Sequence, residues 1–321
     1  EKPALCGVVD WTATAESIGA MVRALDFGNY PNPLGTAKIL ADGEAWIIRT
    51  AVVGDGHGTP GTLLSIQEGE LEVATGDGSL AITALATLTG EEVSVHEVVE
   101  RSGLHEGSLL WTPDESATRE LQALSRLTAK SEGFWQRRLA SIKPAALADL
   151  NAGAASGSVD TRSIAPMSTG ETDPVANAVG AFVVLLSRLT GSDTVDLFLG
   201  NPTASHSIND ALTSPVGVLR GDVEDQRTLR AMSTLVRQEL DTVAARGTWL
   251  QDLVARQPDL LSMVRSADGY LLPVGVVLGQ GDDYEAPPAG ALLTLVADPG
   301  GQHRLVYDQA AISVTDIDHF Y

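Results

Sequence analysis

One segment in the second half of this 321-residue sequence restricts the possible folds more than any other. A helix is predicted from Asp173-Pro174 to Leu189, because Asp and Pro are typical of a helix start and Gly191 of the position after a helix end. Its residues 178–186, Ala-Val-Gly-Ala-Phe-Val-Val-Leu-Leu, are apolar all round. Such a helix must be buried on nearly every side, so other elements have to surround it.

The segments after this helix predict strands and one more helix. Strands are expected at 194–199, 271–279, 291–297 and 303–308, the last one after a turn at 299–301. An amphipathic helix runs from Leu229 to Val243 and ends before Gly247. Residues 151–162, rich in Gly, Ala and Ser, predict a loose loop. This part of the chain is therefore predicted to be a mixed α and β domain.

The first hundred residues have a different pattern. Residues 14–27 have the spacing of an amphipathic helix, and residues 28–35 contain two prolines and two glycines, which predict a rigid loop. Short strands are then expected at 45–53, 62–66, 70–75 and 79–88, with Asp77-Gly78 as a hairpin turn. One helix leading into several short strands predicts a small, strongly curved barrel.

A domain boundary is predicted at Thr112-Pro113-Asp114-Glu115. Thr112 is expected to cap a helix that continues to Leu139, with Pro113 at its first position and Glu115 completing a capping box. We therefore expect two domains, 1–111 and 112–321, a number that suits the length of the chain.

The charge of the chain restricts its partners. Its 42 acidic and 21 basic residues give a net charge of −21, and a nucleic-acid partner would require a cationic surface. No stretch reaches the roughly 18 apolar residues of a membrane span. The single cysteine, Cys6, cannot form an intrachain disulfide, which fits a cytoplasmic location. Because the sequence starts at Glu1 without a signal-peptide pattern, we expect a segment of a longer protein.

The run from Val22 to Lys38, Val-Arg-Ala-Leu-Asp-Phe-Gly-Asn-Tyr-Pro-Asn-Pro-Leu-Gly-Thr-Ala-Lys, resembles the C-terminal domain of formyltransferases of the methionyl-tRNA formyltransferase type. Residues 60–64 and 75–78 are similar to that family's Pro-Gly-Thr strand start and later turn. Over about residues 8–110 the resemblance implies an OB-like β-barrel. In the family, a catalytic Asn, His and Asp surround formyl-tetrahydrofolate in a separate N-terminal domain that is absent from this sequence. The family's C-terminal domain can help bind tRNA through basic residues, and this version is acidic. The resemblance thus implies a fold and neither the reaction nor the tRNA.

Arg23, Tyr30, Asn32 and His206 are candidates for an interface or a structural loop. Arg23 and Asn32 either take part in function or, more simply, brace and cap the loop, since Asn commonly bonds nearby backbone. His206 lies in a Ser-rich segment that either faces a channel or is a solvated loop. The glycine-rich segment 54–58 around His57 is interpreted as a flexible loop between strands.

The segment Phe134-Trp135-Gln136-Arg137-Arg138-Leu139 is similar to the Tyr-Trp-x-x-x-Leu segment of condensation domains in nonribosomal peptide synthetases. Segments 187–191, 194–202 and 215–220 resemble later family segments in the same order. Over about residues 120–321 this resemblance implies the C-terminal lobe of the chloramphenicol-acetyltransferase-like fold. The predicted fold class is thus α+β: an OB-like β-barrel with a leading helix, followed by half of a chloramphenicol-acetyltransferase-like α/β sandwich.

The resemblance is incomplete where catalysis would reside. A working condensation domain needs an N-terminal lobe that ends in His-His-x-x-x-Asp-Gly, whereas no two of the six histidines here are adjacent. Ala204-Ser205-His206-Ser207 stands where the family has a Gly-Arg pair. The histidines lack metal-ligand spacing, and no nucleophile elbow or phosphate-binding loop is present. We therefore assign no catalytic, cofactor-binding or metal-binding residue.

Three hypotheses follow. The first is a non-catalytic N-terminal region of a nonribosomal peptide synthetase that positions or docks adenylation, carrier or upstream partner domains. The second is part of an enzyme, which completes a formyltransferase or condensation site in trans. The third is a small-molecule binding module that uses a cleft between the domains. The sequence does not distinguish the parent pathway, the partner or the oligomeric state.

Overall fold

A computed structural model describes residues 2–145, 158–164, 173–200, 208–223, 228–266, 272–279, 290–312 and 317. Two compact units make up the chain. Unit 1 contains residues 1–136, 206–214 and 249–266, and unit 2 contains residues 137–205, 215–248 and 267–321. Unit 1 therefore includes segments from both predicted domains. None of the helices in the described ranges is both long and apolar enough to cross a membrane.

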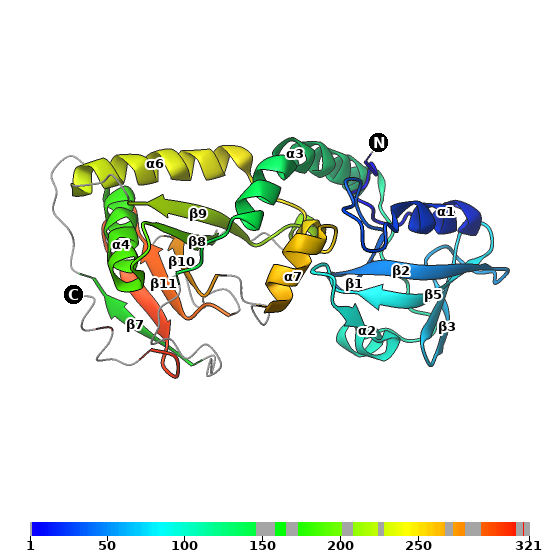
Figure 1. Ribbon diagram of the computed structural model, residues 1–321. Coiled ribbons are helices and arrows are strands. Elements are labelled where there is room, and N and C mark those ends of the chain that lie inside the picture. The colour runs from blue at the N-terminus through cyan, green and yellow to red at the C-terminus, as the bar shows by residue number, and fades with distance from the viewer. Residues whose placement is uncertain are drawn as a thin grey trace. The chain divides into compact units, whose positions relative to one another are not determined.

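Unit 1 is built on a six-stranded antiparallel sheet (Figure 1). Five strands follow the order β1-β2-β5-β4-β3, and β6 also pairs with β5. The strands are β1 (Lys38–Ala41), β2 (Glu44–Gly54), β3 (Leu63–Gln67), β4 (Glu70–Ala74), β5 (Ser79–Ala86) and β6 (Glu92–Val93). The four predicted strands are confirmed as β2 to β5, whereas β1 and β6 were not predicted.

Two local features curl this sheet. Asp42 and Gly43 both have positive φ angles, of 46° and 76°, and join β1 to β2 as a two-residue hairpin turn. The pairing of β2 with β5 shifts register on both sides of Thr50, and such a bulge bends a strand. The described pairings leave β1 and β3 at opposite ends of the order, so they define an open, curled sheet. Closure into an OB-like barrel stays a prediction.

Helix α1 (Ala15–Leu25) packs on this sheet and is capped by Thr14, whose side chain accepts a hydrogen bond from the Ser17 N–H. Helix α2 (Val95–Arg101) follows β6, and helix α3 (Glu115–Ala140) comes next.

The predicted cap of α3 is wrong. Asp114, rather than Thr112, accepts the N–H of Ala117, at 2.8 Å, and the helix starts at Glu115. An aspartate two positions nearer the helix provides the better acceptor for its first turn.

Three later elements complete unit 1: α5 (Ile208–Leu212), a 3₁₀ turn η2 (Gln251–Leu253) and α7 (Pro258–Ser266). Their side chains share apolar clusters with the first hundred residues. Leu212 and Leu121 join Cys6, Val8 and Leu40 in one cluster. Ala255 packs on a second cluster that contains Ile47, Ala86 and Leu88. The amino-terminal sheet is therefore covered by segments distant in sequence.

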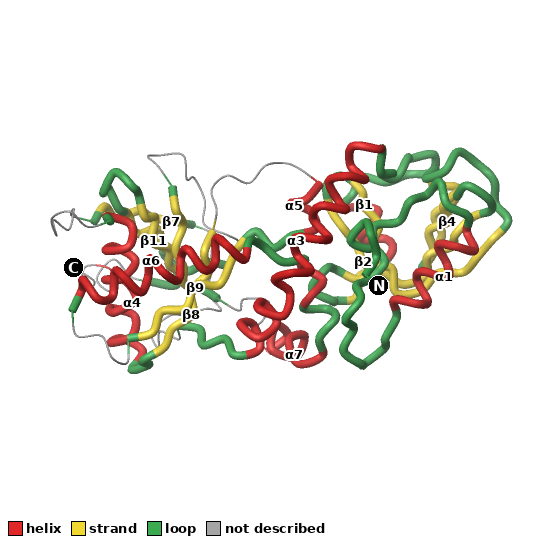
Figure 2. Tube along the Cα trace, turned by 90° about the horizontal axis from the view of Figure 1, so that it is seen from above, coloured by secondary structure: helices red, strands yellow, loops and turns green. Residues whose placement is uncertain are grey.

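Unit 2 contains a mixed six-stranded sheet of order β7-β12-β11-β10-β8-β9. Strand β10 is parallel to both β8 and β11, and the other pairs are antiparallel. The strands are β7 (Val159–Ser163), β8 (Thr194–Gly200), β9 (Val216–Asp222), β10 (Val274–Leu278), β11 (Leu293–Ala297) and β12 (Arg304–Asp308). Figure 2 shows β7, β8, β9 and β11 from above. The four predicted strands of this unit are confirmed as β8, β10, β11 and β12.

The predicted loose loop at 151–162 is wrong for its last residues, because β7 pairs with β12 from Val159 to Ser163. As an edge strand with mostly exposed side chains, β7 lacks the apolar alternation by which strands are recognised. The remainder of that predicted loop up to residue 157 lies outside the described residues.

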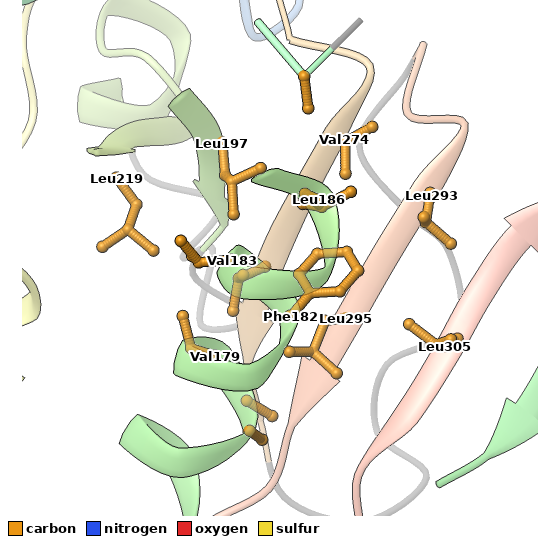
Figure 3. Close-up of a cluster of buried hydrophobic side chains, with 14 of the residues drawn as sticks. Val179, Phe182, Val183, Leu186, Leu197, Leu219, Val274, Leu293, Leu295 and Leu305 are labelled. Carbon is orange, nitrogen blue, oxygen red and sulfur yellow. The ribbon is translucent and has the colours of Figure 1, made fainter. Parts of the chain in front are cut away.

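Helices α4 (Pro174–Thr190) and α6 (Leu229–Arg246) pack on this sheet and on each other. As predicted, Asp173 caps α4 and Gly191 ends it in the left-handed conformation. Phe182, Val183 and Leu186 of α4 lie against Leu197 of β8, Val274 of β10 and Leu295 of β11 (Figure 3). The apolar helix is thus the centre of the unit 2 core.

Two leucines three positions apart on α4 test this core. We expect Leu186→Ala to lower the free energy of unfolding by about 2–5 kcal/mol, because Leu186 is fully buried and its loss leaves a cavity. Leu189→Ala is the matched control, since that side chain is 48% exposed, and it should have a much smaller effect. Urea denaturation of both variants measures the difference. Equal losses would contradict the packing described for α4.

Candidate functional site

The most organised group of charged side chains in the described chain is a buried network in unit 1. At its centre the Lys38 Nζ lies 2.7 Å from the Asp252 Oδ2, and neither side chain is exposed to solvent. The Lys38 ammonium also donates hydrogen bonds to the carbonyl oxygens of Cys6 at 2.7 Å and Thr36 at 3.0 Å. Its three N–H groups thus have three acceptors, as a buried ammonium requires.

The carboxylate of Asp252 has further donors. It accepts hydrogen bonds from the Thr36 backbone N–H at 3.1 Å and from the Thr36 hydroxyl at 2.8 Å, both at Oδ2. The Arg256 Nε approaches Oδ1 at 3.4 Å, an ion-pair contact outside hydrogen-bond geometry. Because Asp252 and Arg256 are four residues apart, the turn of chain that follows η2 holds both on the same side.

Arg256 extends the network to α3. Its Nη2 lies 2.8 Å from the Glu132 Oε2, and Lys2 forms an ion pair with the same carboxylate. Glu132 is partly exposed, with 18% of its side chain accessible, so the network leads from the core towards the surface. Four separate parts of the chain therefore meet here: the amino terminus, residues 36–38, α3, and residues 252–256.

The Tyr-Pro-Asn-Pro loop is joined to the same network through Asn32. The Asn32 side chain donates to the carbonyl oxygens of Leu25 and Gly35, and accepts from the N–H groups of Leu34 and Gly35. Its backbone N–H donates to the Arg256 carbonyl at 2.8 Å, and the Arg256 Nη1 donates to its carbonyl at 3.0 Å. Asn32 therefore fixes the loop and its position against Arg256.

The charges in this network stabilise one another. Burial by itself would raise the pKa of Asp252, but the attraction of Lys38 and Arg256 outweighs it and holds that pKa well below its usual range. The pKa of Glu132 is also lowered, because hydrogen bonding and attraction from Arg256 and Lys2 exceed the effect of burial. Burial would lower the pKa of Arg256, but attraction by Asp252 and hydrogen bonding to Glu132 raise it. All these groups are ionised at neutral pH and bonded to neighbours.

The other predicted candidates lie apart from this network. Arg23 is an exposed residue in the last turn of α1, and its guanidinium makes no hydrogen bond or ion pair within the described ranges. Tyr30 is 78% exposed in the loop that Asn32 anchors. His206 lies outside the described residues. The structure thus places Asn32 in the network and does not bring Arg23 to it.

The glycine-rich segment around His57 is held by the sheet. The Ser79 hydroxyl accepts the N–H of Gly56 at 2.9 Å and donates to Glu72 Oε1 at 2.7 Å. A Cβ on Gly56 would lie 2.7 Å from the ends of both the Glu72 and Leu64 side chains, so a larger residue there would displace them. His57 itself is exposed.

The thiol beside this network is not activated. It belongs to Cys6, whose pKa burial raises to about 11, so it is protonated at neutral pH. Within the described residues, no group of three or more His, Cys, Asp or Glu residues could hold a metal ion. What this arrangement can do is fasten segments together in one register.

A cavity of about 610 Å³ lies elsewhere in unit 1. It is lined by the β1–β2 turn, including Asp42, and by residues 102–105 and 108–112. His105 is its titratable ring, and its Nδ1 lies 2.9 Å from the Glu106 carbonyl oxygen. The volume is in the range of small-molecule sites.

Sequence reasoning missed Lys38, Glu132, Asp252 and Arg256. Lys38 follows directly on the recognised loop, and Asp252 and Arg256 have opposite charges at helical spacing with Leu253, Val254 and Ala255 between them. Opposite charges set among apolar residues were the available signal. The pairing itself joins positions more than two hundred residues apart, which no local pattern reveals.

Removing one partner tests the central ion pair. We expect Lys38→Met to lower the free energy of unfolding by about 3–5 kcal/mol, because it strips the buried Asp252 carboxylate of its nearest counter-charge. Adding Asp252→Asn to that variant should recover part of the loss. Lys130→Met, the same change at an exposed lysine of α3, is the control and should have little effect. Additive losses in the Lys38/Asp252 double-mutant cycle would contradict the pairing.

The network also predicts a dependence on pH. The folded-state pKa values of Asp252 and Glu132 are depressed, so their stabilisation is present above the unfolded carboxyl pKa of about 4 and is lost as the pH falls through the folded values. The urea concentration at the unfolding midpoint should therefore decrease as the pH falls below about 4. This decrease should be less steep in Asp252→Asn than in the wild type. Glu120→Gln, at an exposed carboxylate, should keep the wild-type slope. An unchanged slope in Asp252→Asn would argue against the network.

Comparison with known proteins connects the first part of the chain to a family. Residues 6–103 match the family model described as formyl transferase, C-terminal domain, which confirms the first predicted resemblance. The methionyl-tRNA formyltransferase of Methylibium petroleiphilum is 37% identical over 103 residues, which are 32% of this chain and 31% of that protein. That of Pelobacter propionicus is 35% identical over 104 residues, again 32% and 31%. The chain spans about a third of the length of these curated relatives.

Solved structures similar to this chain come from nonribosomal peptide synthetases. The starter condensation domain of the rhizomide synthetase RzmA aligns with 65% of this chain and 55% of its own, at 18% identity and a TM-score of 0.43. The cyclization-docking bidomain of the synthetase EpoB from Sorangium cellulosum aligns with 80% of this chain and 61% of its own, at 13% identity and a TM-score of 0.44. The chain is thus similar in its first third to formyl transferase C-terminal domains, and has condensation and cyclization domains among its structural neighbours.

Proposed function

We propose that this chain is a non-catalytic structural and interaction region of a nonribosomal peptide synthetase, which positions or docks adenylation, carrier or upstream partner domains. One observation carries the proposal. The segment similar to formyl transferase C-terminal domains shares a buried ion network with α3 and residues 252–256, from the condensation-like part. A module that had only been appended would be expected to keep its own closed core.

The chemistry of the network supports a fastening role. Lys38, Asp252 and Arg256 are buried and ion-paired with one another, which favours a structural role over binding of a substrate. The condensation-like part lacks the His-His-x-x-x-Asp-Gly segment that supplies that family's catalytic histidine. The formyltransferase-like part corresponds to about a third of its relatives. Neither resemblance thus covers the part of its family that carries out the reaction, which favours a positioning role.

The cavity near His105 favours one alternative, a small-molecule binding module. A ligand there would raise the melting temperature of the native protein, because binding to the folded state alone stabilises it. His105→Ala should abolish such a shift if the cavity is the site. The trans-acting enzyme hypothesis predicts instead that formyl transfer appears only when a catalytic partner is added.

Deletion of this region from the proposed synthetase tests the main proposal. We expect peptide assembly to fall strongly while amino-acid activation, measured as ATP–pyrophosphate exchange, stays unchanged, because the region carries no activation chemistry. Adding the 321-residue chain back in trans should restore part of the assembly. Turnover of an acyl-carrier substrate by the isolated chain, or full assembly without it, would refute the proposal.

A further inference from the structure

Helix α3 has a basic face in an acidic protein. Leu121, Leu124, Thr128, Ser131 and Trp135 form its buried side. On the opposite side lie Arg119, Arg126 and Lys130, all exposed, and at 100° per residue their directions fall within about 40° of one another. We call these three residues the basic ridge. It extends along α3 for about 16 Å, from a rise of 1.5 Å per residue.

The basic ridge has no acidic partners in the described chain. Arg119 donates from Nε to the carbonyl oxygen of Glu115, and no ion pair joins Arg119, Arg126 or Lys130 to a described carboxylate. Basic side chains elsewhere do pair with acids, among them Lys2, Lys38, Arg101, Arg138, Arg220, Arg237 and Arg256. The chain has twice as many acidic as basic residues, so acidic partners are plentiful. Three neighbouring basic side chains without one are therefore unexpected.

Repulsion between the like charges of the basic ridge destabilises α3 slightly. Arg126 and Lys130 are four residues apart, and like charges at that spacing destabilise a helix by a few tenths of a kcal/mol. Leu127, which is 52% exposed, and Ala123 lie beside the ridge and give it an apolar border. Apolar contact bordered by complementary charge is characteristic of protein interfaces.

We propose that the basic ridge, with Leu127, docks an acidic protein domain of the synthetase, a partner that rests on the function proposed above. The charge pattern selects the partner class. Three cations in line complement an acidic helix or loop at close range, where salt screens the acidic excess of the rest of the chain. The apolar border of Leu127 and Ala123 favours a protein over a nucleic acid, whose phosphate backbone offers no apolar surface.

Matched double variants of the full chain test this inference. Arg126→Glu with Lys130→Glu reverses the ridge, and Arg188→Glu with Arg230→Glu makes the same change in net charge at exposed arginines outside α3. Binding is measured by fluorescence anisotropy for two protein probes, the carrier domain of the proposed synthetase and a synthetic amphipathic helix with a glutamate stripe, and for tRNA as the competing class of partner. We expect the ridge variant to bind both probes about tenfold more weakly, the control variant to match the wild type, and high salt to reduce binding.

The outcomes separate the two proposals. If the wild type binds the acidic helix through the ridge but binds no synthetase domain, the proposed function fails and the ridge stands. If a synthetase domain binds the ridge variant and the control equally well, the ridge assignment is overturned and the proposed function stands. Binding of neither protein probe refutes the ridge assignment. Tighter binding of tRNA than of either protein probe, lost in the ridge variant, would replace the acidic domain with a nucleic acid. Circular dichroism confirms that the variants are folded. Arg126→Gln with Lys130→Gln is a milder pair, which removes the two charges without reversing them.

Discussion

The ion pair between Lys38 and Asp252 is the interaction on which unit 1 depends. Both side chains are fully buried, and together they hold Thr36, the Cys6 carbonyl and the turn after η2 in one arrangement. Two well-packed apolar residues would contribute at least as much stability in such a place, so the net gain from the pair is small. Each buried charge is tolerated only where the other is present.

That mutual requirement explains how two resemblances come to share one folded unit. The network crosses the boundary that the sequence predicts at residues 111 and 112, because Glu132, Asp252 and Arg256 lie beyond it. Apolar contacts follow the same pattern, with Ala255 on Ile47 and Leu212 on Leu40. The chain therefore places these contacts where its two predicted parts meet inside unit 1, and Asn32 connects the Tyr-Pro-Asn-Pro loop to them.

The elements that sequence analysis predicted correctly are those whose signals are local. Helix α4 was predictable from its apolar residues, its cap at Asp173 and its end at Gly191. The strands on either side of Asp77-Gly78 were predictable from that turn. The failures also have physical causes. The cap was assigned to Thr112 because Pro113 suits a first helical position, but the helix begins two residues later and Asp114 caps it. The exposed edge strand β7 lacks alternation. The buried network was not predictable, since Asp252 becomes a buried acid only when residues 36–38 lie beside it.

The long separation between the partners of this network bears on how the protein is made. On the ribosome, the sheet of unit 1 is complete in sequence once β6 has emerged, yet Asp252 and Arg256 are synthesised much later. Until then the Lys38 ammonium has no counter-charge to bury against, and the apolar surface around Ile47 and Leu88 is uncovered. The nascent amino-terminal sheet thus lacks these buried contacts until most of the chain has been synthesised, and exposed apolar surface of that kind is what chaperones protect.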